Sequence, residues 1–338
     1  MSRLAVILFN LGGPDSPEAV KPFLRNLFFD PAIIPAPAPV RFLLARYIAG
    51  KRTAPARAVY EQLGGSSPLL AQTEAQARAL EAALTAQGQE ARCFIAMRYW
   101  HPRAAAALAA VRLYEPDEIV ALPLYPQYST TTSGSSLAEW QKLAGADARL
   151  RVLCCHPLLE GLVEAWAGPL AEAVRCARAA APVRVLFSAH GLPERVVAKG
   201  DPYAWQVART AEALQAAAEA RLDGLSGVDW RVTWQSRATP EKWLQPDTGV
   251  EVEAAAREGL ALVLAPIAFI SEHSETLVEL DLEYRAVAER AGAAAWERVA
   301  TPGTAPNYIE ALAALVLDSQ PQKRLCPASC SGCPVKAA

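Results

Sequence analysis

Residues 183–194 read V-R-V-L-F-S-A-H-G-L-P-E, and this stretch decides the fold that we predict. Residues 183–187 form a short apolar run, which is typical of a buried strand in an α/β sheet. His190 follows this run, and Gly191 and Pro193 favour a sharp turn. Ligands of open α/β sheets bind beyond the carboxyl ends of the strands. His190 is therefore a candidate for chemistry; the alternative is a histidine of a surface loop or of the core.

Similar apolar runs recur along the chain, with helical stretches between most of them. This alternation predicts parallel sheets with crossover helices. The predicted strands are 4–9, 93–97, 119–124, 183–187, 230–234 and 261–266. The first three strands and the loops after them resemble the last three in sequence, in the same order. For example, A-V-I-L-F-N-L-G-G-P resembles V-R-V-L-F-S-A-H-G-L-P.

We therefore expect an α/β fold of two similar Rossmann-like domains whose parallel sheets face a central cleft. The alternative is a chance similarity between apolar strands. The predicted domains are 1–148 and 149–304, followed by a C-terminal helix and a cysteine-bearing extension at 305–338.

Composition narrows the class of protein. The chain has 338 residues, 33 basic and 35 acidic, and a formal net charge of -2, so we expect no nucleic-acid partner. Its longest apolar run, Leu260–Ile270, is shorter than the roughly 20 residues that span a bilayer. Seven cysteines, an odd number spread thinly, argue against a secreted disulfide framework. We expect a soluble cytoplasmic protein, either a monomer or a homodimer.

A second group of chemical residues lies at 271–284, S-E-H-S-E-T-L-V-E-L-D-L-E-Y. If this segment is a regular helix, Glu275, Glu279 and Glu283 share one face, where like charges cost a few tenths of a kcal/mol per pair. Such a row is either a solvated acidic face or a path for a metal ion or protons. His190 and Glu275 together suit a divalent metal or proton transfer.

Other features limit the alternatives. The phosphate loop, the dinucleotide fingerprint and the nucleophile elbow are all missing from the sequence, so we expect no nucleotide. Residues 32–52 include an amphipathic stretch in which Phe42, Leu43 and Tyr47 stand among basic residues. This stretch is either a helix packed on the core or an exposed apolar lip that contacts a membrane or an apolar substrate.

Several motifs together resemble the ferrochelatase family, whose members insert ferrous iron into a porphyrin. The matching segments are F-N-L-G-G-P (9–14), G-G-S-S-P-L (64–69), M-R-Y-W-H-P (97–102), P-L-Y-P-Q-Y-S-T-T-T-S-G-S-S (123–136), F-S-A-H-G-L-P-E (187–194), Q-S-R (235–237), W-L-Q-P (243–246) and P-I-A-F-I-S-E-H-S-E-T-L-V-E-L-D-L-E-Y (266–284). They occur in family order over nearly the whole chain.

The resemblance implies that the substrates are protoporphyrin IX and Fe²⁺ and that the reaction is the terminal step of haem biosynthesis. It identifies His190 and Glu275 as the catalytic pair, without deciding which of them takes the protons and which first binds iron. It assigns Glu279 and Glu283 to a proton or metal path, and 32–52 to a lip that also allows peripheral contact with the inner membrane. The implied substrate-binding residues are Tyr60, Ser67, Arg98, Tyr125, Trp243 and His273.

Two alternatives stay open at this point. One is a related chelatase that uses another tetrapyrrole, such as coproporphyrin, or another metal, such as cobalt. The other is a non-catalytic protein that binds porphyrin or iron.

The C-terminal segment C-P-A-S-C-S-G-C (326–333) resembles the extension that carries three ligands of a [2Fe–2S] cluster in some family members. Its Cys-x3-Cys-x2-Cys spacing departs from the animal pattern. The resemblance favours a cluster held by Cys326, Cys330, Cys333 and Cys155, with Cys154 as the alternative fourth ligand. Four sulfurs also suit a structural zinc ion, so ligand type alone does not choose the metal.

Overall fold

The computed structural model describes residues 2–237, 239, 241–320, 326–327 and 329–334. The chain forms two compact units: one holds the described residues of 1–155, 312–326 and 334–338, and the other those of 156–311 and 327–333. The change at His156 falls a few residues after the predicted boundary.

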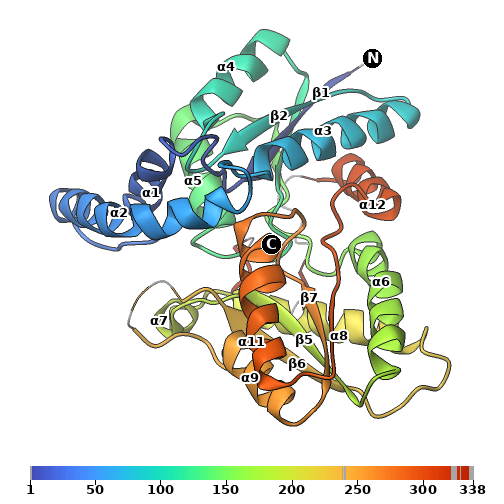
Figure 1. Ribbon diagram of the computed structural model, residues 1–338. Coiled ribbons are helices and arrows are strands. Elements are labelled where there is room, and N and C mark those ends of the chain that lie inside the picture. The colour runs from blue at the N-terminus through green and yellow to red at the C-terminus, as the bar shows by residue number, and fades with distance from the viewer. Residues whose placement is uncertain (1, 238, 240, 321–325, 328, 335–338) are drawn as a thin grey trace. The chain divides into compact units, whose positions relative to one another are not determined.

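The first unit is built on a parallel four-stranded sheet with the order β2-β1-β3-β4 (Figure 1). Its strands are β1 (Arg3–Asn10), β2 (Glu90–Met97), β3 (Glu118–Pro123) and β4 (Leu150–Val152). Its helices are α1 (Val20–Phe28), α2 (Ala38–Glu61), α3 (Leu69–Ala86), α4 (Ala104–Tyr114) and α5 (Ser133–Ala144). β1 and β3 are almost wholly buried, because helices cover both faces of a parallel sheet.

The second unit repeats this architecture with the strand order β6-β5-β7-β8. Its strands are β5 (Val183–His190), β6 (Asp229–Gln235), β7 (Ala261–Pro266) and β8 (Ala295–Arg298). Its helical segments are α6 (Glu160–Arg178), α7 (Glu194–Ala198), α8 (Tyr203–Glu219), α9 (Thr248–Arg257), α10 (Ser274–Leu277), the π-helix η1 (Glu279–Tyr284) and α11 (Arg285–Ala291). α12 (Pro306–Leu317) begins in this unit and ends in the first.

The identical strand orders confirm the predicted fold class of two similar parallel α/β units. β1 and β5, the two echoing strands, occupy the same central place, and each pairs with the next two strands of its own unit. The edge strands β4 and β8 escape prediction because they are only 3 and 4 residues long and half-buried, so they lack an apolar run. In each unit the carboxyl ends of the strands meet at one edge of the sheet.

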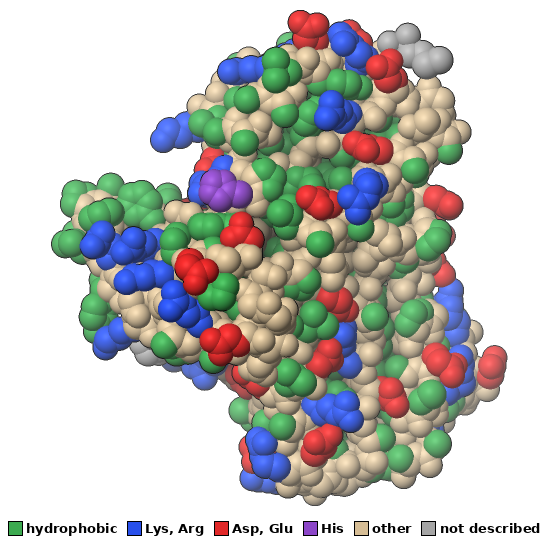
Figure 2. All heavy atoms as spheres, turned by 45° about the horizontal axis from the view of Figure 1, so that its top comes forward, with side chains coloured by type: hydrophobic (Ala, Val, Ile, Leu, Met, Phe, Trp, Pro, Cys, Tyr) green, Lys and Arg blue, Asp and Glu red, His purple; other side chains and the backbone are tan. Residues whose placement is uncertain are grey.

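The amphipathic stretch 32–52 packs on the core through Ile48 and two alanines but not through Phe42 and Leu43. α2 buries Ala45 and Ala49, whereas Phe42 is 50% exposed and Leu43 is 67% exposed. Basic side chains lie over the exposed rings, Arg46 over Phe42 and Lys51 over Tyr47. Figure 2 shows hydrophobic and basic side chains gathered on the part at its left, where Figure 1 shows α1 and α2. Of the two interpretations of this stretch, the core-packed helix is therefore wrong for Phe42 and Leu43.

Replacing Phe42 and Leu43 with aspartate should hardly change the stability of the protein. Exposed substitutions usually stay within about 0.5 kcal/mol, so we expect the melting temperature of the double variant to fall by less than about 4 °C. Phe23→Asp is the matched control, because Phe23 is 5% exposed in the core beside α2 and its loss should unfold the unit. A large fall in melting temperature for the exposed pair, measured by calorimetry, would contradict this description of α2.

Candidate active site

His190 ends the central strand of the second sheet, and Gly191 lets the chain turn there. A Cβ atom on residue 191 would lie 3.0 Å from the Gln235 carbonyl oxygen and 3.1 Å from the Trp243 ring, so only glycine fits easily. The His190 Nδ1 lies 2.7 Å from the Gly191 carbonyl oxygen. A carbonyl can only accept a hydrogen bond, so Nδ1 carries the proton in the neutral ring. The Nε2 lone pair is then available to bind a metal ion or to accept a proton.

Glu275 lies between two imidazoles. Its Oε1 is 3.7 Å from the Nε2 of His190, and its Oε2 is 3.6 Å from the Nε2 of His273. Burial would raise the pKa of Glu275, but the charge of protonated His190 and the hydrogen bond and charge of His273 lower it to about 2. Glu275 therefore stays ionised at neutral pH and supplies a fixed negative charge next to the His190 Nε2.

Glu279 occupies a different environment one turn further along. Its Oε1 accepts hydrogen bonds from the Ser236 amide at 3.0 Å and the Tyr284 hydroxyl at 2.8 Å. Its Oε2 accepts from the Gln235 amide at 3.1 Å and from the Ser236 hydroxyl. Burial and the negative charge of Glu275 nevertheless raise the pKa of Glu279. The two neighbouring carboxyls thus differ: one holds its charge, and the other takes up a proton more readily.

The local backbone explains how these side chains converge. Ser236 has a positive φ of 64°, which turns the chain at the end of β6 so that both its amide and its hydroxyl reach Glu279. Gln235 accepts a hydrogen bond from the Ser188 hydroxyl of β5 and donates to the Glu275 carbonyl at 2.9 Å. The buried amide of Gln235 therefore links the central strand to the acidic segment.

The acidic segment is not the regular helix that its spacing suggested. After the single turn of α10 the chain continues as the π-helix η1, where the Glu283 amide bonds the Val278 carbonyl five residues back. The wider turn shifts the i, i+4 alignment. Glu283 is exposed, whereas Glu275 and Glu279 are largely enclosed. The expectation of three carboxylates on one α-helical face is therefore wrong.

The remaining predicted residues of the second unit lie beside His190. The Trp243 side chain is buried, its ring centre is 6.4 Å from that of His190, and its Nε1 donates to the Thr239 carbonyl. His273 is buried with its ring 4.7 Å from that of Phe269.

In the first unit, two of the predicted residues gather around a buried aspartate. Arg98 lies 2.8 Å from Asp30 and 3.3 Å from Glu139, and its Nε donates to Ser135 at 2.7 Å. Tyr125 is half-buried and feels the same charges. Desolvation raises the pKa of Tyr125, Ser136 and the charge of Arg98 act to lower it, and the charge of Asp30 adds to the rise. Asp30 also accepts a hydrogen bond from the Tyr99 hydroxyl. Sequence reasoning missed Asp30, since a single acid before a proline-rich stretch carries no signal.

Ser67 and Tyr60 are placed by other contacts of the first unit. A Cβ on Gly13 would come within 2.4 Å of Ser67, whose amide donates to the Pro14 carbonyl at 2.7 Å. Tyr60 lies in the last turn of α2 and packs against the cluster of α1 and α2. The structure therefore brings Arg98 and Tyr125 together and places Ser67 against the 12–14 turn.

Two cysteines far apart in the sequence meet in the first unit. The Sγ atoms of Cys155 and Cys326 are 3.4 Å apart, and those of Cys154 and Cys155 are 3.6 Å apart. Two thiolates on one tetrahedral metal ion lie about 3.8 Å apart, so both pairs lie near the spacing of shared ligands. Cys330 and Cys333 form a turn in the second unit, where the Cys333 amide donates a hydrogen bond to the Cys330 carbonyl. Among the described residues, the side chains of His, Cys, Asp and Glu form no group of three or more arranged to hold a metal ion.

Comparison with known proteins places this chain in a family. The family model for ferrochelatase matches residues 3–320. A ferrochelatase of Caulobacter vibrioides is 51% identical over 319 residues, covering 94% of this chain and 90% of its own. One from Phenylobacterium zucineum is 49% identical over 340 residues, with coverages of 98% and 97%.

A solved structure supports the same fold from a greater distance. SirB from Bacillus subtilis, solved with Fe³⁺, superposes with a TM-score of 0.52 at 10% identity and covers 94% of this chain and 95% of its own. This likeness shows the fold alone. The family model and the relatives confirm what the motifs predicted, and the chain belongs to the ferrochelatase family.

Proposed function

We propose that His190 and Glu275 are the residues with which this enzyme inserts ferrous iron into protoporphyrin IX, the terminal step of haem biosynthesis. The observation that carries the proposal is the position of the Glu275 carboxylate, 3.7 Å from the Nε2 of His190 and 3.6 Å from that of His273. Insertion must remove two pyrrole protons while Fe²⁺ loses its water, so the enzyme needs a base and an exchangeable contact for the cation.

His190 is suited to act as the base that removes a pyrrole proton. Its Nδ1 proton is held by the Gly191 carbonyl, so the Nε2 accepts a proton from the porphyrin. The imidazolium that forms then lies next to the ionised Glu275, which stabilises it. Glu275, whose low pKa keeps it charged, suits the first contact for the metal cation.

Glu279 suits the next step of proton removal. Its raised pKa makes Glu279 a better proton acceptor than Glu275. The side-chain amide of Gln235 connects the two residues, because it donates to the Glu279 carboxylate and to the Glu275 backbone carbonyl. We propose that protons leave by way of Glu279 and that the exposed Glu283 is the point where they reach water.

The substrate-binding roles implied by the family resemblance remain part of the proposal. Trp243 and His273 flank the catalytic pair, and the resemblance assigns both of them to the porphyrin pocket. In the first unit the resemblance assigns contacts with the porphyrin to Tyr60, Ser67, Arg98 and Tyr125. The apolar lip formed by the exposed side chains of α2 suits the capture of an apolar porphyrin or attachment to a membrane surface.

We propose a cytoplasmic enzyme, a monomer or homodimer, that attaches to the inner membrane through this lip and has no nucleic-acid partner. Among the described residues, no helix combines the length and apolar character needed to cross a bilayer.

We also propose that Cys155, Cys326, Cys330 and Cys333 bind a [2Fe–2S] cluster. The 3.4 Å spacing of the first two sulfurs fits shared ligation, and the other two cysteines follow Cys326 within seven residues. Cys155, not Cys154, is nearest to Cys326 in the printed sulfur contacts, which favours it as the fourth ligand. A cluster here would fix the C-terminal segment and stabilise the fold by closing a long loop.

The catalytic pair is tested by His190→Ala and Glu275→Gln. Because each removes a base or a charge and little apolar surface, we expect turnover to fall at least about 100-fold. Porphyrin affinity should change only a few-fold, as measured by quenching of tryptophan fluorescence.

Glu289→Gln is the matched control for the carboxylate, because Glu289 is exposed and pairs only locally with Arg285. Its turnover should equal that of the wild type. Wild-type turnover in either His190→Ala or Glu275→Gln would show that the site is wrong.

The cluster is tested by purifying the protein without oxygen. The wild type should be red-brown with iron and sulfide near two each per chain. Cys155→Ser should bleach it, whereas Cys154→Ser and the exposed control Cys176→Ser should keep the colour. A colourless wild type with stoichiometric zinc would refute the cluster, and a coloured Cys155→Ser protein would move the fourth ligand to Cys154.

A further inference from the structure

The segment that carries His273, Glu275 and Glu279 has little regular backbone to hold it. α10 is a single turn of 4 residues, and it runs directly into the π-helix η1. Although α11 continues the helical stretch from Arg285, the rare π-helical turn interrupts the regular hydrogen-bond ladder where the carboxylates stand. Interactions outside that ladder therefore help to fix the carboxylates at their positions.

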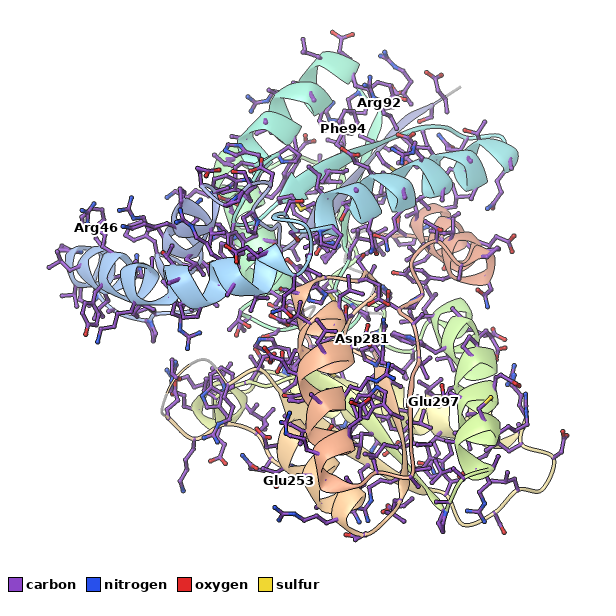
Figure 3. The ribbon with its side chains drawn as sticks, in the orientation of Figure 1. Arg46, Arg92, Phe94, Glu253, Asp281 and Glu297 are labelled. Atoms are coloured by element: carbon purple, nitrogen blue, oxygen red, sulfur yellow. The ribbon has the colours of Figure 1, made fainter. Side chains whose placement is uncertain are left out.

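Arg298 provides such an interaction at both ends of the segment. It is the last residue of β8, and its guanidinium makes a bidentate pair with Asp281 of η1, with distances of 2.7 and 2.8 Å. Its Nη1 donates to Glu272 at 2.6 Å, and Glu272 also accepts the Thr301 amide. Figure 3 labels Asp281 on the helical segment that leads into α11.

The two carboxylates that Arg298 binds enclose the catalytic carboxylates in the sequence. Glu272 directly precedes His273, and Asp281 follows Glu279 by two residues. Arg298 is only 14% exposed, so the pairs are shielded from solvent more than ordinary surface pairs are. A planar guanidinium fixes the distance between its two partners, which a lysine ammonium on a flexible stem cannot do.

We propose that Arg298 is a positioning residue of this enzyme. It fixes the backbone on both sides of Glu275 and Glu279, and so holds Glu275 at its spacing from His190 and His273. This inference rests on the proposed function of that pair. A displacement of about 1 Å at such a site can cost about 100-fold in rate, so loosening the clamp should affect turnover before it affects stability.

The test compares Arg298→Lys with Arg184→Lys. Arg184 is the matched control, because it is 5% exposed and also binds two carboxylates, Asp229 and Glu258, but it lies near the amino end of β5. We expect Arg298→Lys to lower kcat at least about tenfold with unchanged porphyrin affinity and a melting temperature close to that of Arg184→Lys. Arg184→Lys should keep wild-type kcat.

A second variant and a double variant separate positioning from general destabilisation. Asp281→Asn, which removes the charge that Arg298 binds in η1, should reproduce the loss of kcat. Adding Arg298→Lys to Glu275→Gln should cause no further loss of kcat, because the Glu275 carboxylate that Arg298 positions is already absent.

The inference fails if His190→Ala and Glu275→Gln are inactive while Arg298→Lys keeps the kcat of Arg184→Lys. It also fails if kcat of the double variant is reduced by the product of the two factors measured for the single variants. Full activity in His190→Ala or Glu275→Gln would overturn the proposed site and this inference with it.

Discussion

The proposed chemistry depends on one electrostatic arrangement, the Glu275 carboxylate between the imidazoles of His190 and His273. Their attraction outweighs the cost of burying the charge, so the pKa of Glu275 falls to about 2. Burial and that fixed charge together raise the pKa of Glu279 nearby. Two glutamates four residues apart in the sequence thereby acquire different roles, because their environments push their pKa values in opposite directions.

The repeated sheet explains where this arrangement lies. β1 and β5 occupy the same place in their sheets, and they end in Asn10 and His190, respectively. The Asn10 amide donates to Thr73 and cannot act as a base at neutral pH, whereas His190 can. The proton chemistry that we propose therefore belongs to the second unit, and the corresponding edge of the first unit carries the Asp30–Arg98 pair.

Much of the fold could be predicted from the sequence, because buried parallel strands are continuous apolar runs, and because His190 ends one such strand and Glu275 stands in the segment that follows another. The edge strands β4 and β8 could not, since they have no such run. The π-helix was also missed, because residue spacing alone cannot tell one helix type from another, and Glu283 is exposed although the row of carboxylates was expected to share one face. Asp30, Ser236 and Arg298 act through contacts with residues distant in the sequence, for which no local pattern exists.

The most direct test of this account is to measure the ionisation of the two carboxyls separately. Carbon NMR of protein labelled at the glutamate carboxyl carbon, with Glu275→Gln and Glu279→Gln used to assign the signals, would follow both groups during an acid titration. The account predicts that Glu275 remains ionised far below the usual glutamate pKa of about 4.3 and that Glu279 becomes protonated above it. A Glu275 signal that titrates at or above the ordinary value, or a Glu279 signal that titrates below it, would contradict the central claim.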